Sequence, residues 1–418
     1  MNKKAEYINR ILAITVILSL CIVFAQRTLR HHMGFVNSIS NSIGNFINSG
    51  EAFSGRIYNF YMEMHGGIKG NVEWNYSYPP RVNDFEYLNY EYLRATRRGH
   101  FNRVTFLTDG RIMFDNLEPN LYLEERAESI AGFSNYLERN GIPFLFVRIP
   151  NKLQDSSVLP LAFSNNHIIE NGYKLLELVG QRGVDTFDLR AEMMNDHIDF
   201  STAFYRYHMH WTNETVLWAS QAIGQLMNRE YGFNIDLDIW NLDQYHQLLF
   251  KSTLHGNEAT TIGRFRKLED ITLLTPIFPV DLEMSNSNTG FEVAASNNFV
   301  EMFYPRIYEG HTERFICNDI RLPGAHFTHI INHAATENKR VMLISDSFSL
   351  SWAMYLPLGF SHLDFVYLIN QRTAEEIWGF LDGKEYDLII LAASDVIIST
   401  ETASVFEDDR LYLGIPPN

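Results

Sequence analysis

The chain has 418 residues, of which 46% are hydrophobic and 20% charged, and this is the composition of a globular protein with one large domain or two rather than of a disordered chain. The formal net charge is −16, and no basic stripe is visible, which argues against a nucleic-acid binder. The two cysteines, Cys21 and Cys317, lie too far apart along the chain to indicate a disulfide framework or a cysteine-based zinc site.

The first thirty residues predict a membrane signal. Residues 11–25 are an uninterrupted run of apolar or small residues that follows three basic ones. This run has the length of a signal-peptide core, whereas a spanning helix needs roughly 20 residues, which 7–25 nearly supplies if the bilayer thins slightly. The polar region that usually precedes cleavage is missing, so we predict an uncleaved signal-anchor over 1–30, with a cleaved signal peptide or a buried helix as alternatives. The anchor implies a single-pass protein of the cell membrane, and both the anchor and the cleaved peptide place the main domain outside the cytoplasm.

An α/β alternation follows the N-terminal region. Residues 31–99 are polar with scattered aromatics and predict a juxtamembrane stalk, and residues 100–234 form the first part of the predicted domain. This part opens with a hairpin over 104–114, because two apolar runs flank the turn pair Asp109-Gly110. Apolar periodicity and turn signals then predict helices over 122–139, 173–182 and 212–231 and strands over 142–149 and 186–189.

Residues 235–335 interrupt this alternation. They are rich in Asn, Thr, Gly and Phe, with short alternating segments, and predict a β-rich insertion or lid. The second part of the domain, 336–418, contains apolar runs at 340–344 and 386–391 that are typical of central parallel strands. We therefore predict an α/β fold, a parallel sheet flanked by helices, with functional residues beyond the carboxyl ends of its strands.

A serine occupies one of these strand ends. Ser347 comes shortly after the apolar strand at 340–344, and Ser349 begins a predicted helix. A serine at such a turn is exposed above the sheet edge and lies near a helix N-terminus, which favours negative charge developing on an oxygen. On these residues alone, an Asp or Ser that caps the helix is the simpler interpretation.

Two histidines precede the helix at 212–231. His208 and His210 are two residues apart, so on an extended segment their side chains point to the same side. They could be metal ligands, although no third histidine or carboxylate has a recognisable spacing. They could equally be structural histidines beside Trp211, or His210 could be the general base for a serine, oriented through its other ring nitrogen.

The serine and histidine motifs together resemble a known family. His-Trp-Thr at 210–212 before a helix, followed more than a hundred residues later by an apolar strand and Asp-Ser-Phe-Ser at 346–349, is similar to the SGNH-hydrolase-like family that contains the alginate O-acetyltransferases. It is most similar to the bacterial subgroup named for an Asp-His-His-Trp (DHHW) motif. Other motifs in the family's order are the Asp-Gly hairpin at 109–110, Pro-Asn-Lys at 150–152, the strand at 184–189 and Asn-Gln-Arg at 370–372. The resemblance covers residues 100–400.

The resemblance implies an SGNH-like fold in which Ser347 carries the acyl group and His210 is its base. It also implies that Arg372, Gly256 with Asn257, and Trp211 contribute to binding of the oxyanion or the substrate. Arg372 fits a surface or sheet-edge arginine equally well, and Gly256 with Asn257 fits a turn in a lid better. No metal and no cofactor are implied.

One position departs from the family pattern. The family has an aspartate two residues before the catalytic histidine, and this chain has His208 there. A neutral imidazole can accept a hydrogen bond from His210, but it stabilises an imidazolium far less than a carboxylate does. Loss of the orienting carboxylate costs a triad about four orders of magnitude in rate. The site could therefore work as a Ser-His dyad, or another carboxylate could take the aspartate's place. Asp346 and Asp199 are the nearest carboxylates in sequence. A third possibility is that the site has lost catalysis.

The leading hypothesis is an extracytoplasmic, serine-dependent O-acyltransferase or acyl esterase that acts on a cell-surface polysaccharide or envelope glycopolymer. The resemblance also implies a membrane partner that supplies acyl groups. The alternative is a catalytically inactive glycan-binding or assembly protein with the same fold, and a third hypothesis is a metal-dependent hydrolase that uses the two histidines. Whether the chain is an enzyme stays open at this point, and no nucleic-acid partner is expected.

Overall fold

A computed structural model describes residues 100–101, 104–114, 119–159, 166–256, 268–286, 294–312, 315–316, 320–323, 327–368, 374–381, 383–400 and 413. The predicted anchor at 1–30 and the predicted stalk at 31–99 both fall outside this part of the chain. Within the part described, no helix has both the length and the apolar character needed to cross a membrane.

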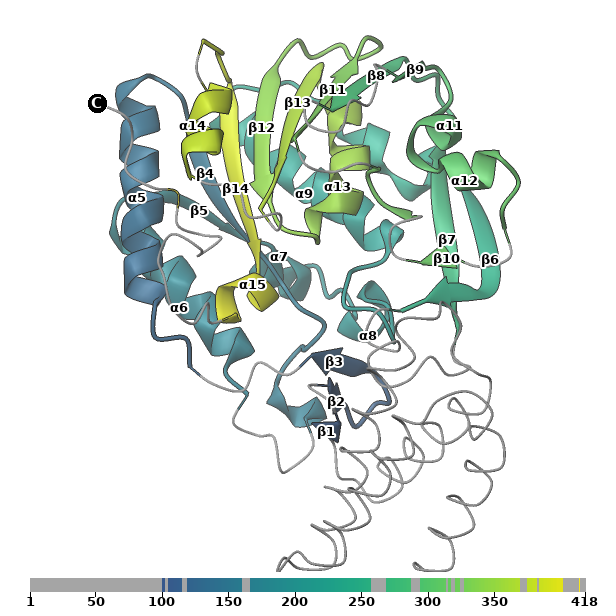
Figure 1. The fold of residues 1–418 in the computed structure, drawn as a ribbon, viewed down its shortest axis with the longest axis horizontal. Coiled ribbons are helices and arrows are strands. Elements are labelled where there is room, and N and C mark those ends of the chain that lie inside the picture. Colours follow the sequence, from purple (N-terminus) through teal and green to yellow (C-terminus); the bar gives the residue numbers. More distant parts are fainter. Residues whose placement is uncertain are drawn as a thin grey trace, which may run out of the picture. The chain divides into compact units, whose positions relative to one another are not determined.

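The main sheet has eight strands: β4 (Phe144–Ile149), β5 (Asp185–Asp188), β8 (Leu282–Asn286), β9 (Ala294–Ser296), β11 (Phe327–Asn332), β12 (Arg340–Ser345), β13 (His362–Tyr367) and β14 (Leu388–Ser394). Their spatial order is β5-β4-β14-β12-β13-β11-β8-β9 (Figure 1). The first five run parallel to one another, and the last three continue the sheet with antiparallel pairing.

The prediction of a parallel sheet is therefore wrong at one edge, and the sheet is mixed. A parallel strand needs a crossover of a dozen or more residues to reach its neighbour. The connection from β11 to β12 consists only of residues 333–339, which is too short for such a crossover. β11 consequently runs opposite to β12 and β13.

Helices cover both faces of the sheet (Figure 1). The helices are α5 (Leu123–Arg139), α6 (Ile168–Gln181), α7 (Leu189–Asn195), α8 (Phe200–Ala203), α9 (Asn213–Glu230), α11 (Phe299–Phe303), α12 (Pro305–Tyr308), α13 (Ser349–Tyr355), α14 (Ala374–Leu381) and α15 (Asp395–Ser399). Along β14, Leu388, Ile390 and Ala392 enter the core shared with α7, α9 and α13. The alternate residues Ile389, Leu391 and Ala393 enter the core shared with α5, α6 and α14. Burial on both faces explains why the central strands are continuous apolar runs in the sequence.

The predicted helix boundaries have identifiable local causes. α5 ends at Asn140-Gly141, where Gly141 adopts a φ of 72°, a left-handed conformation that glycine accommodates without strain. α9 begins after Thr212, whose side chain accepts a hydrogen bond from the Thr215 amide at 3.4 Å. The start of α9 fixes the end of the histidine segment that precedes it.

The segment predicted as a β-rich insertion contributes to two different sheets. β6 (Tyr245–His255), β7 (Glu269–Pro276) and β10 (Phe315–Ile316) form a separate three-stranded sheet in the order β10-β6-β7. β8, β9 and β11 instead extend the main sheet. The predicted hairpin at 104–114 is present as β2 (Val104–Phe106) and β3 (Ile112–Phe114), with β1 (His100–Phe101) pairing beside β2.

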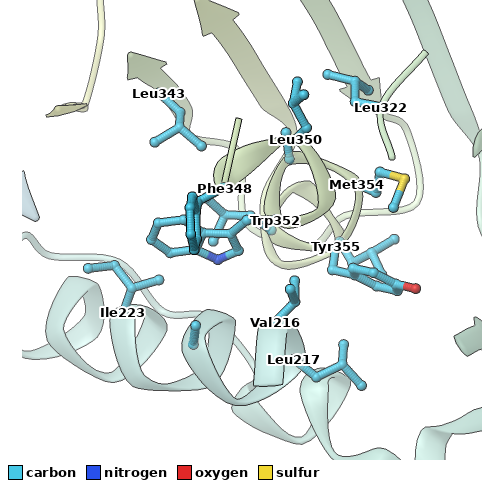
Figure 2. Packing of buried hydrophobic residues seen from close by; sticks show 14 of the residues in the cluster. Val216, Leu217, Ile223, Leu322, Leu343, Phe348, Leu350, Trp352, Met354 and Tyr355 are labelled. Atoms are coloured by element: carbon cyan, nitrogen blue, oxygen red, sulfur yellow. The ribbon is translucent and has the colours of Figure 1, made fainter. Parts of the chain in front are cut away.

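The core beneath the serine turn joins α13 to α9. Figure 2 shows Phe348 and Trp352 above Val216 and Ile223 of α9. Trp211, predicted on the substrate side, is only 1% exposed, packs edge-on against Trp352 and donates its Nε1–H to the Phe348 carbonyl at 2.9 Å. That prediction is wrong, because a side chain buried in this core cannot contact a substrate. Trp211 instead ties the histidine segment to the serine turn.

Candidate active site

Ser347 lies in the turn between β12 and α13, and Asp346 holds that turn to the sheet. One carboxylate oxygen of Asp346 accepts the Phe348 amide and the other accepts the Ser394 amide at the end of β14, both at 2.8 Å. Asp346 is 2% exposed and makes no hydrogen bond with either histidine of the site. Its carboxylate positions the backbone at the carboxyl ends of two parallel strands.

The histidine segment lies between α8 and α9 and is held by its backbone. The amide of Tyr205 donates to the carbonyl of His210 at 3.1 Å, so the segment folds back on itself. Lys152, which is 2% exposed, donates from Nζ to the carbonyls of Ile112, Tyr205 and His208 at 2.7, 3.0 and 2.9 Å. The ammonium group thus donates to two carbonyls of the histidine segment and to one of β3.

The structure brings Ser347, His210 and His208 together in one row. The Oγ of Ser347 lies 3.0 Å from Nε2 of His210, and Nδ1 of His210 lies 3.0 Å from Nδ1 of His208. The backbone amide of His210 also donates to Nδ1 of His208 at 3.2 Å. This is the nucleophile–base–orienting-group geometry of a triad, with an imidazole in the position of the carboxylate.

Both histidines are buried, 1% exposed for His208 and 7% for His210. Burial lowers the pKa of His208 to about 3, and the charges of Lys152 and Arg321 act in the same direction. Burial also lowers the pKa of His210 well below its usual value, with smaller contributions from His208, Arg321 and Lys152. Both rings are therefore neutral at neutral pH, and a neutral His210 can act as a base.

No carboxylate in the described part of the chain hydrogen-bonds to His208 or His210. Asp199 caps α8 by accepting the Ser201 amide at 2.8 Å, and its side chain is exposed. Glu269 accepts the amide of Tyr207 at 2.6 Å and also that of Arg206, so it binds the backbone of the segment rather than the rings. Neither Asp346 nor Asp199 replaces the missing aspartate in this structure.

The other predicted residues are placed as follows. A Cβ at Gly256 would collide with the Tyr207 carbonyl, so this glycine allows β6 to pack against the histidine segment. Asn257 and Arg372 lie outside the described residues. Among the described residues, no group of three or more His, Cys, Asp or Glu side chains is arranged to hold a metal ion.

Two charged residues near the histidines were missed by sequence reasoning. Lys152 was recognised only as part of a family motif, and Arg321 belongs to no motif at all. A lysine after a strand is usually a surface residue, and only its position three residues after a fully buried strand hinted at burial. Arg321, in the segment between β10 and β11, carries no signal in the sequence that relates it to the histidines.

Replacing Lys152 with methionine tests its hold on the histidine segment. Three buried carbonyls would lose their donor while the side-chain volume is kept, so we expect a loss of about 3 kcal/mol in the free energy of unfolding, since each unsatisfied buried group costs about 1–3 kcal/mol. Urea unfolding measures this loss. Lys174→Met is the matched control, because Lys174 is half exposed and its one ion pair with a described residue is with Glu177. Equal stability of the two variants would contradict this role of Lys152.

Comparison with known proteins bears on the fold and the family. Residues 112–236 match the SGNH hydrolase-like domain of the acetyltransferase AlgX. The predicted resemblance to this family is confirmed over these residues. No curated protein matches the chain.

Two solved structures extend the likeness over most of the chain. Bacillus cereus PatB1, determined with a sulfonyl adduct, has a TM-score of 0.57 and 14% identity, over 72% of this chain and 97% of that one. A DHHW family protein from Eubacterium siraeum has a TM-score of 0.53 and 10% identity, over 76% of this chain and 98% of that one. At these identities the likeness shows a shared fold alone, and the matched family model describes that fold as SGNH-like.

Proposed function

We propose that the chain is an O-acyltransferase or acyl esterase with Ser347 as nucleophile and His210 as general base. The observation that carries the proposal is the 3.0 Å distance from Ser347 Oγ to His210 Nε2. The position of Ser347 at the carboxyl end of a central parallel strand also supports it, because sites of open α/β sheets form there. The match to an SGNH hydrolase-like acetyltransferase domain favours acyl groups among the groups that an activated serine can accept.

The reaction has two steps. In the first, Ser347 Oγ attacks the acyl carbonyl while its proton passes to His210 Nε2, and the tetrahedral intermediate collapses as the leaving oxygen takes that proton. In the second, an acceptor hydroxyl gives its proton to His210 and attacks the acyl-serine, and the acyl–Oγ bond breaks as His210 returns that proton to Ser347 Oγ. Water as acceptor makes the chain an esterase, and a sugar hydroxyl makes it a transferase.

The proposed substrate is a cell-surface polysaccharide or envelope glycopolymer that carries O-acyl groups. Support comes from the alginate O-acetyltransferase resemblance and from the predicted N-terminal signal, which would place the domain outside the cytoplasm. A membrane anchor at 1–30 would hold the domain near a membrane partner that supplies acyl groups. The location, the glycan and the partner are all parts of this proposal.

Turnover of an acetyl ester tests the function. The full chain should release acetate from p-nitrophenyl acetate and, with an oligosaccharide acceptor present, the fraction of acetyl groups found on sugar by mass spectrometry separates transfer from hydrolysis. Ser347→Ala should reduce both to the background rate. Ser351→Ala is the matched control, because Ser351 lies on the same helix, partly exposed, and should react at the wild-type rate. Equal activity of the Ser347→Ala variant and the wild type would reject the proposal.

The imidazole at position 208 supports one alternative function, an inactive glycan-binding protein, because no carboxylate in the described residues contacts His210. Binding of oligosaccharide by wild type and Ser347→Ala alike, together with no acetyl turnover by either, is the result that this alternative predicts.

A further inference from the structure

The hydrogen bonds around His208 determine where its proton lies. Nδ1 of His208 receives the backbone amide of His210 at 3.2 Å. An amide N–H can only donate, so this nitrogen must offer a lone pair. A histidine with an unprotonated Nδ1 is neutral and carries its proton on Nε2.

The same reasoning assigns the protons of His210. Its Nδ1 lies 3.0 Å from the Nδ1 of His208, which is an acceptor, so Nδ1 of His210 must donate. A neutral His210 then has its lone pair on Nε2, which lies 3.0 Å from Ser347 Oγ. This is the tautomer that a general base for serine requires, and it is reached without a carboxylate.

The charged groups around the pair disfavour a second proton on His208. Its Nε2–H is buried and has no acceptor among the described residues. Lys152 lies on one side, bound to the carbonyl of His208, and the charges of Lys152 and Arg321 both disfavour the cationic ring. The nearby carboxylates of Glu269 and Asp346 accept backbone amides instead of contacting the ring. A cation on His208 would therefore be buried beside two further positive charges, with no carboxylate of the described residues in contact with its ring.

We infer that His208 is a permanently neutral positioning residue, which orients His210 through its Nδ1 acceptor and keeps that base uncharged under acidic conditions where a carboxylate-supported base is already protonated. This inference rests on the proposed function of Ser347 and His210. On this inference, the histidine that replaces the family's aspartate at position 208 extends the activity of the same site to lower pH.

The direction of the pH effect follows from the charge at position 208. Burial, then His208 itself and the two cations, lower the pKa of His210, so the reactive neutral form persists as the pH falls and is lost only below that depressed pKa. An aspartate at 208 would place an opposite charge beside His210 and raise its pKa, so reactivity would be lost at a higher pH. The same charge would stabilise the imidazolium that forms during reaction, so the rate at high pH would increase.

The experiment is the second-order rate constant for labelling of Ser347 by a fluorophosphonate, measured on the full chain from pH 4 to pH 9. We expect His208→Asp to react about tenfold or more faster than wild type at pH 8. The acidic limb of its pH–rate profile, where the labelling rate falls with falling pH, should lie at least about one pH unit higher than in the wild type. His208→Asn keeps a neutral acceptor and should retain the wild-type acidic limb. His208→Leu removes the acceptor and should react about a hundredfold more slowly at every pH.

Nitrogen-15 NMR of the histidine rings provides a readout that does not depend on reactivity or on the folding of a variant. In the wild type at pH 6, His208 should be protonated on Nε2 alone and His210 on Nδ1 alone. A His208 ring protonated on both nitrogens would overturn the inference, as would an acidic limb that His208→Asp leaves unmoved. Absence of labelling in the wild type at every pH would instead reject the proposed function.

Discussion

Replacing His210 with alanine should slow fluorophosphonate labelling of Ser347 by about three orders of magnitude at neutral pH, within the range that a positioned general base contributes. The physical reason is the 3.0 Å contact between His210 Nε2 and Ser347 Oγ, since without it no described group accepts the serine proton. The loss corresponds to about 4 kcal/mol of transition-state stabilisation. Added imidazole should restore part of the rate by entering the space that the ring leaves.

His333→Ala is the control for removing a histidine, because that side chain is half exposed and, within the described part of the chain, pairs with Glu283 alone. It should label at the wild-type rate. Equal labelling of His210→Ala and wild type would mean that Ser347 reacts without this base. Failure of imidazole to rescue, together with a lowered melting temperature, would show that the ring acts through packing.

Replacing Asp395 with alanine should lower the free energy of unfolding by about 3 kcal/mol, the lower end of the cost of breaking a buried ion pair, because Arg148 would keep its longer ion pair with Asp188 at 3.3 Å. Asp395 accepts Nε of Arg148 at 2.7 Å, and both side chains are fully buried. Its second oxygen accepts the side-chain amide of Asn151 at 3.0 Å. The pair anchors the carboxyl ends of β14 and β4, and Asn151 directly precedes the lysine that holds the histidine segment.

Glu124→Ala is the matched control, because Glu124 also pairs with an arginine, Arg182, at 2.8 Å but at the surface. An exposed ion pair contributes about 0–1 kcal/mol, so this variant should unfold close to the wild type in urea. Asp395→Asn, which keeps an oxygen acceptor for Arg148, should fall between the two. If Asp395→Ala and Glu124→Ala lowered the free energy of unfolding equally, burial of the Arg148–Asp395 pair would not add to its contribution to stability.

The central strands and the site residues were predictable because their signals are local. β12 and β14 are apolar runs bounded by polar residues, and a strand-to-helix turn places Ser347 at the sheet edge. The choice of His210 as partner rested on the order of motifs, and its contact with Ser347 joins residues 137 positions apart. Tautomers and pKa shifts required the three-dimensional contacts.

The features that were missed depend on contacts between distant segments. The mixed edge of the sheet arises because β11 lacks the length of connection for a parallel crossover. The Arg148–Asp395 pair joins positions 247 residues apart, and either residue alone reads as a surface charge. Trp211 was assigned to the substrate side because motif order cannot tell which face of a segment enters the core.

The most direct test of the nucleophile is the site of covalent modification. The full chain is incubated with a fluorophosphonate at neutral pH, digested and mapped by mass spectrometry. The structure predicts one adduct on Ser347, greatly reduced in His210→Ala. An adduct on another serine, or an unmodified Ser347 in a folded protein, would contradict the assignment of the active site.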